Sequence, residues 1–119
     1  MKEFNGVLEY KNREYKLVFN LNSMEVIQEE YGSIDKWGEL TDGSKKNKGE
    51  PNIKALIFGL AAMINEGIEI DNDEKGEDIK PLTLKQVGRM LSEVGLTNAQ
   101  KAMNETVINS TKSDNEKNE

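Results

Sequence analysis

The chain has 119 residues, which is the size of one domain, and it carries a net charge of −6. It contains no cysteine and no histidine, which excludes disulfides, thiolate nucleophiles, Cys/His zinc sites and imidazole bases. The acidic charge disfavours nonspecific binding to nucleic acid or to an anionic membrane, because the electrostatic term is repulsive. We therefore expect a protein that binds other proteins, without catalysis, cofactor or metal.

The two segments that bear on location are the N-terminus and the longest apolar run. The first six residues lack the apolar region of a signal peptide. The run from Ile53 to Ile64 contains Lys54 and is too short to span a bilayer. The sequence therefore predicts a cytoplasmic protein that does not bind membranes.

Residues 4–21 predict an antiparallel β-hairpin. With Asn12-Arg13 as the turn, Leu8 lies opposite Leu17, and nearly all the large apolar residues share one face. A four-residue loop is the alternative, because arginine fits a type I′ turn poorly. An isolated hairpin is marginal in water, so we expect helices to cover its apolar face.

The hairpin is followed by two short helices. Asn22 is the predicted N-cap of the first, Leu21 contacts Val26 in a hydrophobic staple, and Gly32 ends it in the left-handed conformation. Ser33 caps a second short turn that carries three apolar residues, Ile34, Trp37 and Leu40. Residues 41–50 have no periodicity and predict a mobile loop.

A central helix is expected from Pro51 to about Glu66, with Gly67 as its C′ residue and Ile68 packing back on Met63. One face of this helix is apolar and carries Ile53, Leu56, Ile57, Leu60 and Ile64. The opposite face is also apolar and carries Ala55, Phe58, Gly59 and Ala62. A helix that is apolar on two sides is expected to be buried on two sides.

The C-terminal third begins with an acidic connector, residues 69–80. Thr83 and Gln86 then form a capping box for a helix with an apolar stripe (Leu84, Val87, Leu91 and Val94) that ends at Gly95. A second capping box at Thr97 to Gln100 opens a last helix that reaches about Ile108. Residues 110–119 are polar throughout and predict a disordered tail.

The predicted fold is therefore α+β, with an N-terminal antiparallel β-hairpin followed by a bundle of four to five helices. Residues 1–109 form one domain, which includes the mobile loop 41–50 and the acidic connector 69–80.

No catalytic or metal site emerges from the carboxylates. Asp71 and Asp73 match the start of an EF-hand calcium loop, but Leu82 stands where a bidentate glutamate is required. The pair Glu29-Glu30 lies on a predicted exposed face, with no cleft to separate the two pKa values.

The residues that we single out for contact with a partner or a second copy are aromatic or small. They are Tyr31, Trp37, Ala55, Phe58, Gly59 and Ala62. Core packing is the alternative for the aromatic residues. The small residues predict a close helix neighbour, which lies either in this chain or in the next subunit.

Several segments carry a resemblance to a known family: Phe4-Asn5-Gly6, residues 15–20, residues 24–32, the turn around Trp37, residues 57–60 through 65–67, and residues 84–88. Together they resemble the tail assembly chaperones of long-tailed, siphovirus-type phages and prophages of Gram-positive bacteria. The resemblance covers about residues 3–108.

The resemblance implies a specific role. Such chaperones self-associate, coat the helical tape-measure protein during assembly, recruit tail-tube protein and leave before the virion is complete. The partners implied are therefore the tape-measure protein, the tail-tube protein and further copies of the chain, all in the host cytoplasm. In many such phages a frameshift adds a longer C-terminal extension, and residues 110–119 lie where that shift would occur.

Two other functions fit the sequence. A structural tail component, such as a tube or connector subunit, would be retained in the virion. A nucleic-acid regulator is suggested by the two helices joined at Gly95, as in a helix-turn-helix. That helix pair carries few basic residues (Lys85, Arg89 and Lys101), and Glu93 and Glu105 offset them, which disfavours this second alternative.

Overall fold

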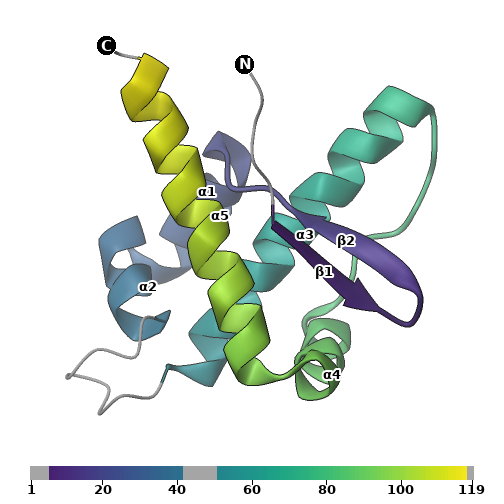
Figure 1. Cartoon of the computed structure of the whole chain (residues 1–119), viewed down its shortest axis with the longest axis horizontal. Helices are drawn as coiled ribbons and strands as arrows, with labels where there is room; N and C mark the ends of the chain where they lie inside the picture. The colour runs from purple at the N-terminus through teal and green to yellow at the C-terminus, as the bar shows by residue number, and fades with distance from the viewer. Residues whose placement is uncertain (1–5, 42–50, 118–119) are drawn as a thin grey trace.

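The computed structural model describes residues 6–41 and 51–117, with side chains as far as Ser110. The strands and helices follow one another as β1 Gly6–Tyr10, β2 Arg13–Leu17, α1 Leu21–Tyr31, α2 Ile34–Thr41, α3 Ile53–Lys75, α4 Leu84–Val94 and α5 Leu96–Lys117. Figure 1 shows the hairpin beside the helices, with α3 running through the middle of the molecule. The predicted α+β fold, a hairpin followed by a helical bundle, is confirmed.

The hairpin has a different register from the predicted one. Leu8 pairs with Tyr15 and Gly6 with Leu17, so the predicted pairing is wrong by two residues and the predicted turn by one. The turn is Lys11-Asn12, with φ of 53° and 65°, and positive φ at both positions is typical of a type I′ turn. A two-residue shift keeps every side chain on its face, so Leu8 and Leu17 are both buried as expected.

The chain leaves the sheet earlier than predicted, at Leu17. Val18 and Phe19 are buried after the strand ends, and the Val18 amide donates to the Met63 carbonyl of α3. Asn20, not Asn22, caps α1 through a reciprocal capping box with Ser23. The predicted staple is also wrong, because Leu21 is 80% exposed.

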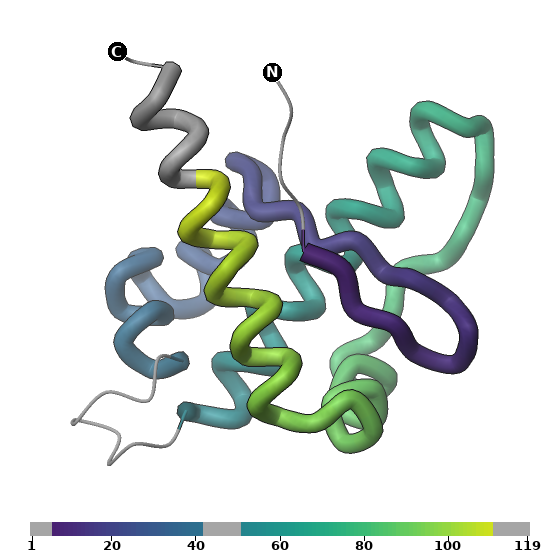
Figure 2. Tube along the Cα trace, viewed as in Figure 1, coloured from purple at the N-terminus to yellow at the C-terminus, as the bar shows by residue number. Residues whose placement is uncertain are grey.

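The central helix α3 continues well past Gly67, to Lys75, and Gly76 ends it in the left-handed conformation. The predicted helix end at Gly67, with its contact between Ile68 and Met63, is therefore wrong. Gly67 has another role, since a Cβ there would lie 2.8 Å from the Lys16 carbonyl oxygen of β2. The glycine lets the hairpin pack closely on α3, and Figure 2 shows the hairpin crossing that helix.

The segment between α3 and α4 is held by two asparagine side chains of α3. The Asn65 carboxamide donates to the Leu82 carbonyl and accepts from the Leu82 amide, at 3.0 and 2.8 Å. Asn72 makes the same pair of bonds with Ile79, each 3.0 Å long. The predicted connector 69–80 is therefore helical in its first half and fastened to α3 in its second.

The start of α4 is as predicted, with a reciprocal capping box between Thr83 and Gln86. Gly95 ends α4 with a φ of 99°, and α5 begins directly afterwards at Leu96, one residue before the predicted cap. The helix α5 extends to Lys117. The disorder predicted for residues 110–119 stays a prediction, and nearly all of the predicted loop 41–50 lies outside the described residues.

The core surrounds α3, which contributes residues on several of its sides. The most fully buried large side chains are Leu17, Ile27, Leu56, Leu60, Met63, Ile64, Met90 and Met103. They come from β2, α1, α3, α4 and α5, so a single core joins the hairpin to the bundle. At the far edge of the sheet, the Gly6 amide donates to the Thr106 hydroxyl of α5 at 2.9 Å.

Candidate functional site

Trp37 of α2 covers the part of the second apolar face of α3 that holds Ala55 and Gly59. Its indole nitrogen donates to the Ala55 carbonyl at 3.0 Å, and its ring lies directly on Gly59. A Cβ at Gly59 would lie 2.8 Å from both Cε2 and Nε1 of the indole. The close neighbour that the small residues predict is therefore Trp37 of the same chain.

This packing corrects the prediction for three candidate partner residues. Trp37 is 2% exposed, Ala55 is fully buried and Gly59 is buried. Phe19 stacks on the indole with a centroid distance of 6.3 Å. All three residues belong to the core, so they offer no surface to another molecule.

The other three candidates lie at the border of the core. Phe58 and Ala62 are half-buried on α3, and Tyr31 packs edge-on against Phe58 with a centroid distance of 5.6 Å. Burial raises the pKa of the Tyr31 hydroxyl, and the nearby Glu30 carboxylate raises it further. That hydroxyl is buried and meets no hydrogen-bond partner in the part of the chain that the structure describes.

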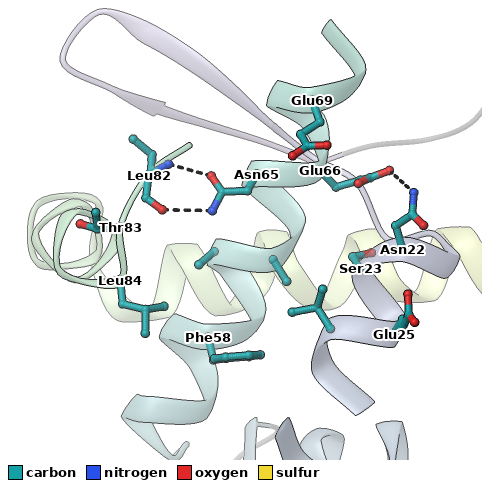
Figure 3. Close-up of a pocket in the computed structure, with 13 residues that line it drawn as sticks. Asn22, Ser23, Glu25, Phe58, Asn65, Glu66, Glu69, Leu82, Thr83 and Leu84 are labelled. Atoms are coloured by element: carbon teal, nitrogen blue, oxygen red, sulfur yellow. Dashed lines mark hydrogen bonds between the residues drawn. The ribbon is translucent and has the colours of Figure 1, made fainter. Parts of the chain in front are cut away.

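Phe58 and Ala62 form part of the floor of an open groove. Figure 3 shows α3 between two walls: Asn22, Glu25 and Val26 of α1 stand on one side, and residues 82–84 at the start of α4 on the other. The floor is completed toward the C-terminal end of α3 by Asn65, Glu66 and Glu69. We call this recess, together with its continuation below, the α3 groove.

The groove continues between α3 and α4. Its second stretch is lined by Ile53, Lys54, Ile57, Phe58, Leu84, Lys85, Gly88, Arg89 and Ser92. Phe58 and Leu84 line both stretches, so the two adjoin at these residues. Gly88 leaves space for Ile57, whose Cδ1 lies 3.6 Å from where a Cβ would be.

Large apolar side chains at the groove are open to solvent. Val26 is 45% exposed, and Ile53 and Leu84 are each 50% exposed. The sequence assigned Ile53 and Leu84 to buried helix faces and Val26 to a staple, and all three assignments are wrong. Contiguous exposed apolar surface in a groove marks a site for another molecule more often than isolated apolar residues do.

The charged residues of the α3 groove are separated by sign along its length. Glu25, Glu66 and Glu69 lie at the end toward the C-terminus of α3. Lys54, Lys85 and Arg89 lie at the other end. Glu66 also accepts hydrogen bonds from the Asn20 and Asn22 side chains, at 2.8 and 3.0 Å, which hold its carboxylate in place.

Asp71, the first residue of the partial calcium-loop motif, is engaged by lysine side chains. The Lys16 ammonium donates to the Asp71 carboxylate at 2.9 Å, and Lys75 lies 4.0 Å from its second oxygen. The hydrogen bond from Lys16 is the main reason that the pKa of Asp71 is lowered. No group of three or more acidic side chains is placed to hold a metal ion in residues 6–41 and 51–110.

Within the described ranges, no helix combines the length and the apolar character needed to cross a membrane. Comparison with protein-family models, with curated proteins and with solved structures gave no match.

Proposed function

We propose that the chain is a tail assembly chaperone of a siphovirus-type phage or prophage. In this role it self-associates, binds the tape-measure protein without catalysing a reaction, and promotes assembly of the tail tube. It acts in the cytoplasm of the bacterial host, recruits the tail-tube protein and is absent from the finished virion. The family in this proposal comes from the resemblance of residues 3–108.

One structural observation supports a binding role of this kind: the open apolar α3 groove. Leaving Val26, Ile53 and Leu84 half-exposed forgoes burial energy, at about 25 cal/mol for each Å² of apolar surface. A partner that covers these residues recovers that energy. The groove therefore fits a protein whose work is to hold another chain.

The decisive experiment is co-purification. The tagged chain is expressed together with the tape-measure protein of the same phage or prophage, and we expect the two to elute together at high salt. Mass spectrometry of purified virions is the companion measurement, with the chaperone expected to be absent. Its presence at a stoichiometric level would instead identify a structural tail component, such as a tube or connector subunit.

Self-association is tested by light scattering across a concentration series, where we expect the mean mass to rise with concentration. A strict monomer at high concentration would contradict this part of the proposal. Gly59→Arg is not a suitable probe, because the Trp37 indole occupies the space that the new side chain needs. Exposed positions are required instead, and Ile108 of α5, which is 61% exposed, is one of them.

A further inference from the structure

We infer that the α3 groove binds one amphipathic helix of a partner protein, in a fixed orientation that is set by charge. The partner helix carries an apolar stripe, basic residues at one end and acidic residues at the other. This inference rests on the proposed function, in which the partner helix belongs to the tape-measure protein. It adds which surface binds, and which chemistry the bound segment must have.

The shape of the groove argues for a helix. The floor is a helix, α3. Toward the C-terminus of α3 the walls are α1 on one side and residues 82–84 on the other (Figure 3), and along the second stretch α4 is the wall. A single convex helix fills such a recess, with side chains at i, i+3, i+4 and i+7 packing on the apolar floor. Two copies of the groove placed face to face would leave the space between them unfilled, which disfavours a symmetric dimer through this surface.

The length of the groove sets the length of the segment. Lys54 and Glu69 mark its two ends, and they lie fifteen residues apart on α3. At 1.5 Å for each residue this is about 22 Å, so a bound helix of about 15 residues, or four turns, spans the groove. Four turns of the partner helix place two or three layers of its apolar side chains over Ile57, Phe58 and Ala62.

The charge separation sets the orientation. Acidic residues of the partner lie over Lys54, Lys85 and Arg89, and basic residues lie over Glu25, Glu66 and Glu69. The reversed orientation places like charges together, which is unfavourable. A partner helix with charges of a single sign is complementary to only one end of the groove.

The first test uses substitutions in this chain and affinity for the tape-measure protein. Val26→Arg and Leu84→Arg are expected to weaken binding by at least about tenfold, which is about 1.4 kcal/mol. Val7→Arg is the matched control, because Val7 of β1 is 46% exposed and lines neither stretch of the groove. Circular dichroism and thermal unfolding establish that each variant is folded.

Charge reversal gives a second set of variants that do not alter apolar packing. Lys85→Glu combined with Arg89→Glu is expected to weaken binding about tenfold or more at low salt, and less at high salt. Lys36→Glu combined with Lys101→Glu changes the net charge equally at exposed positions outside the groove. An equal loss in both double variants would overturn the oriented groove.

A designed peptide tests the groove independently of the proposed function. A helical peptide of about 15 residues carries a leucine stripe, acidic residues in one half and basic residues in the other. A control peptide has the same stripe and composition with the charges interspersed. The separated peptide is expected to bind about tenfold more tightly, and Lys85→Glu combined with Arg89→Glu to abolish the difference.

These outcomes distinguish the two proposals. If the tape-measure protein binds and Val26→Arg and Leu84→Arg leave its affinity unchanged, the groove inference is overturned and the chaperone proposal survives. If the tape-measure protein does not bind but the separated peptide does, the groove inference stands and the chaperone proposal fails. If the groove variants change only the self-association seen by light scattering, the occupant is a second copy, which overturns the inference.

Discussion

The apolar strip Ala55, Phe58, Gly59 and Ala62 of α3 divides into two parts with opposite fates. Ala55 and Gly59 are covered by the Trp37 indole, which packs against the helix backbone. Phe58 and Ala62 lie at the floor of the α3 groove, between half-exposed Val26 and Leu84. Apolar character alone does not separate the two parts, because both are apolar in sequence. Residue size does not separate them either, because Ala62 is small and lies in the open groove.

The first test of this contrast removes the indole ring of Trp37. Trp37→Ala is expected to lower the free energy of unfolding by about 3–5 kcal/mol, because a buried aromatic ring is lost and a cavity remains. Urea unfolding followed by circular dichroism is the appropriate measurement, since the chain has only one tryptophan. A loss below about 1 kcal/mol would mean that this face is not a stable part of the core.

A smaller effect is expected from Gly59→Ala. The new Cβ would meet the Trp37 ring, which its hydrogen bond and the stacked Phe19 hold in place, and overpacking costs about 1–3 kcal/mol. The higher helix propensity of alanine offsets about 1 kcal/mol of that, so a net loss of about 1 kcal/mol is expected. Gly38→Ala is the matched control, because nothing lies within 4 Å of a Cβ there. It is expected to stabilise α2, and the two variants should therefore differ in sign.

The side chains of the open groove are expected to contribute less to the free energy of unfolding than the buried side chains of α3. Leu84→Ala removes a side chain that is already half-exposed, so the loss of stability is expected to stay below about 1 kcal/mol. Leu60→Ala, at a fully buried position of α3, is expected to lose about 2–5 kcal/mol. Thermal or urea unfolding of the pair measures the contrast. Similar losses would show that the groove is closed in solution.

The smallest effect concerns the C-terminal end of α3, which meets the hairpin through Lys16 and Asp71. The pKa of Asp71 is lowered from its ordinary 3.8, so its ion pair contributes stability above that pH and loses it as the pH falls through the lowered value. Both side chains are partly exposed, so Asp71→Asn is expected to cost only a few tenths of a kcal/mol at neutral pH. Urea midpoints of the two proteins should converge at acidic pH and at high salt.

Local signals in the sequence predicted several features correctly. Thr83 and Gln86 cap α4 as expected, Gly32 and Gly95 follow the helices that they were expected to end, and the hairpin has its predicted apolar face. Each of these features depends on residues that are close together in the chain. They are therefore visible without knowledge of the tertiary structure.

The errors arose where a local signal had a tertiary cause. The sequence predicts a helix end at Gly67, but the Lys16 carbonyl packs against this glycine in the middle of α3. The hairpin turn was misplaced because Lys11, an unusual residue for positive φ, occupies the first turn position.

The groove was missed for a related reason. Periodicity shows that Ile53 and Leu84 lie on apolar stripes, but it does not show whether another element of the chain reaches them. The Gly59 strip did predict a close neighbour, and only the structure identifies it as Trp37.

The two hydrogen bonds between Asn65 and Leu82 bear on the thermodynamics of filling the α3 groove. They fix the wall residues 82–84 to α3 before a partner binds. The paired donor and acceptor bonds resemble those between two residues of neighbouring β-strands. A wall that is already ordered loses little conformational entropy on binding, and preorganisation of this kind raises affinity without any new contact. A single carboxamide thus fixes one wall of the groove to its floor.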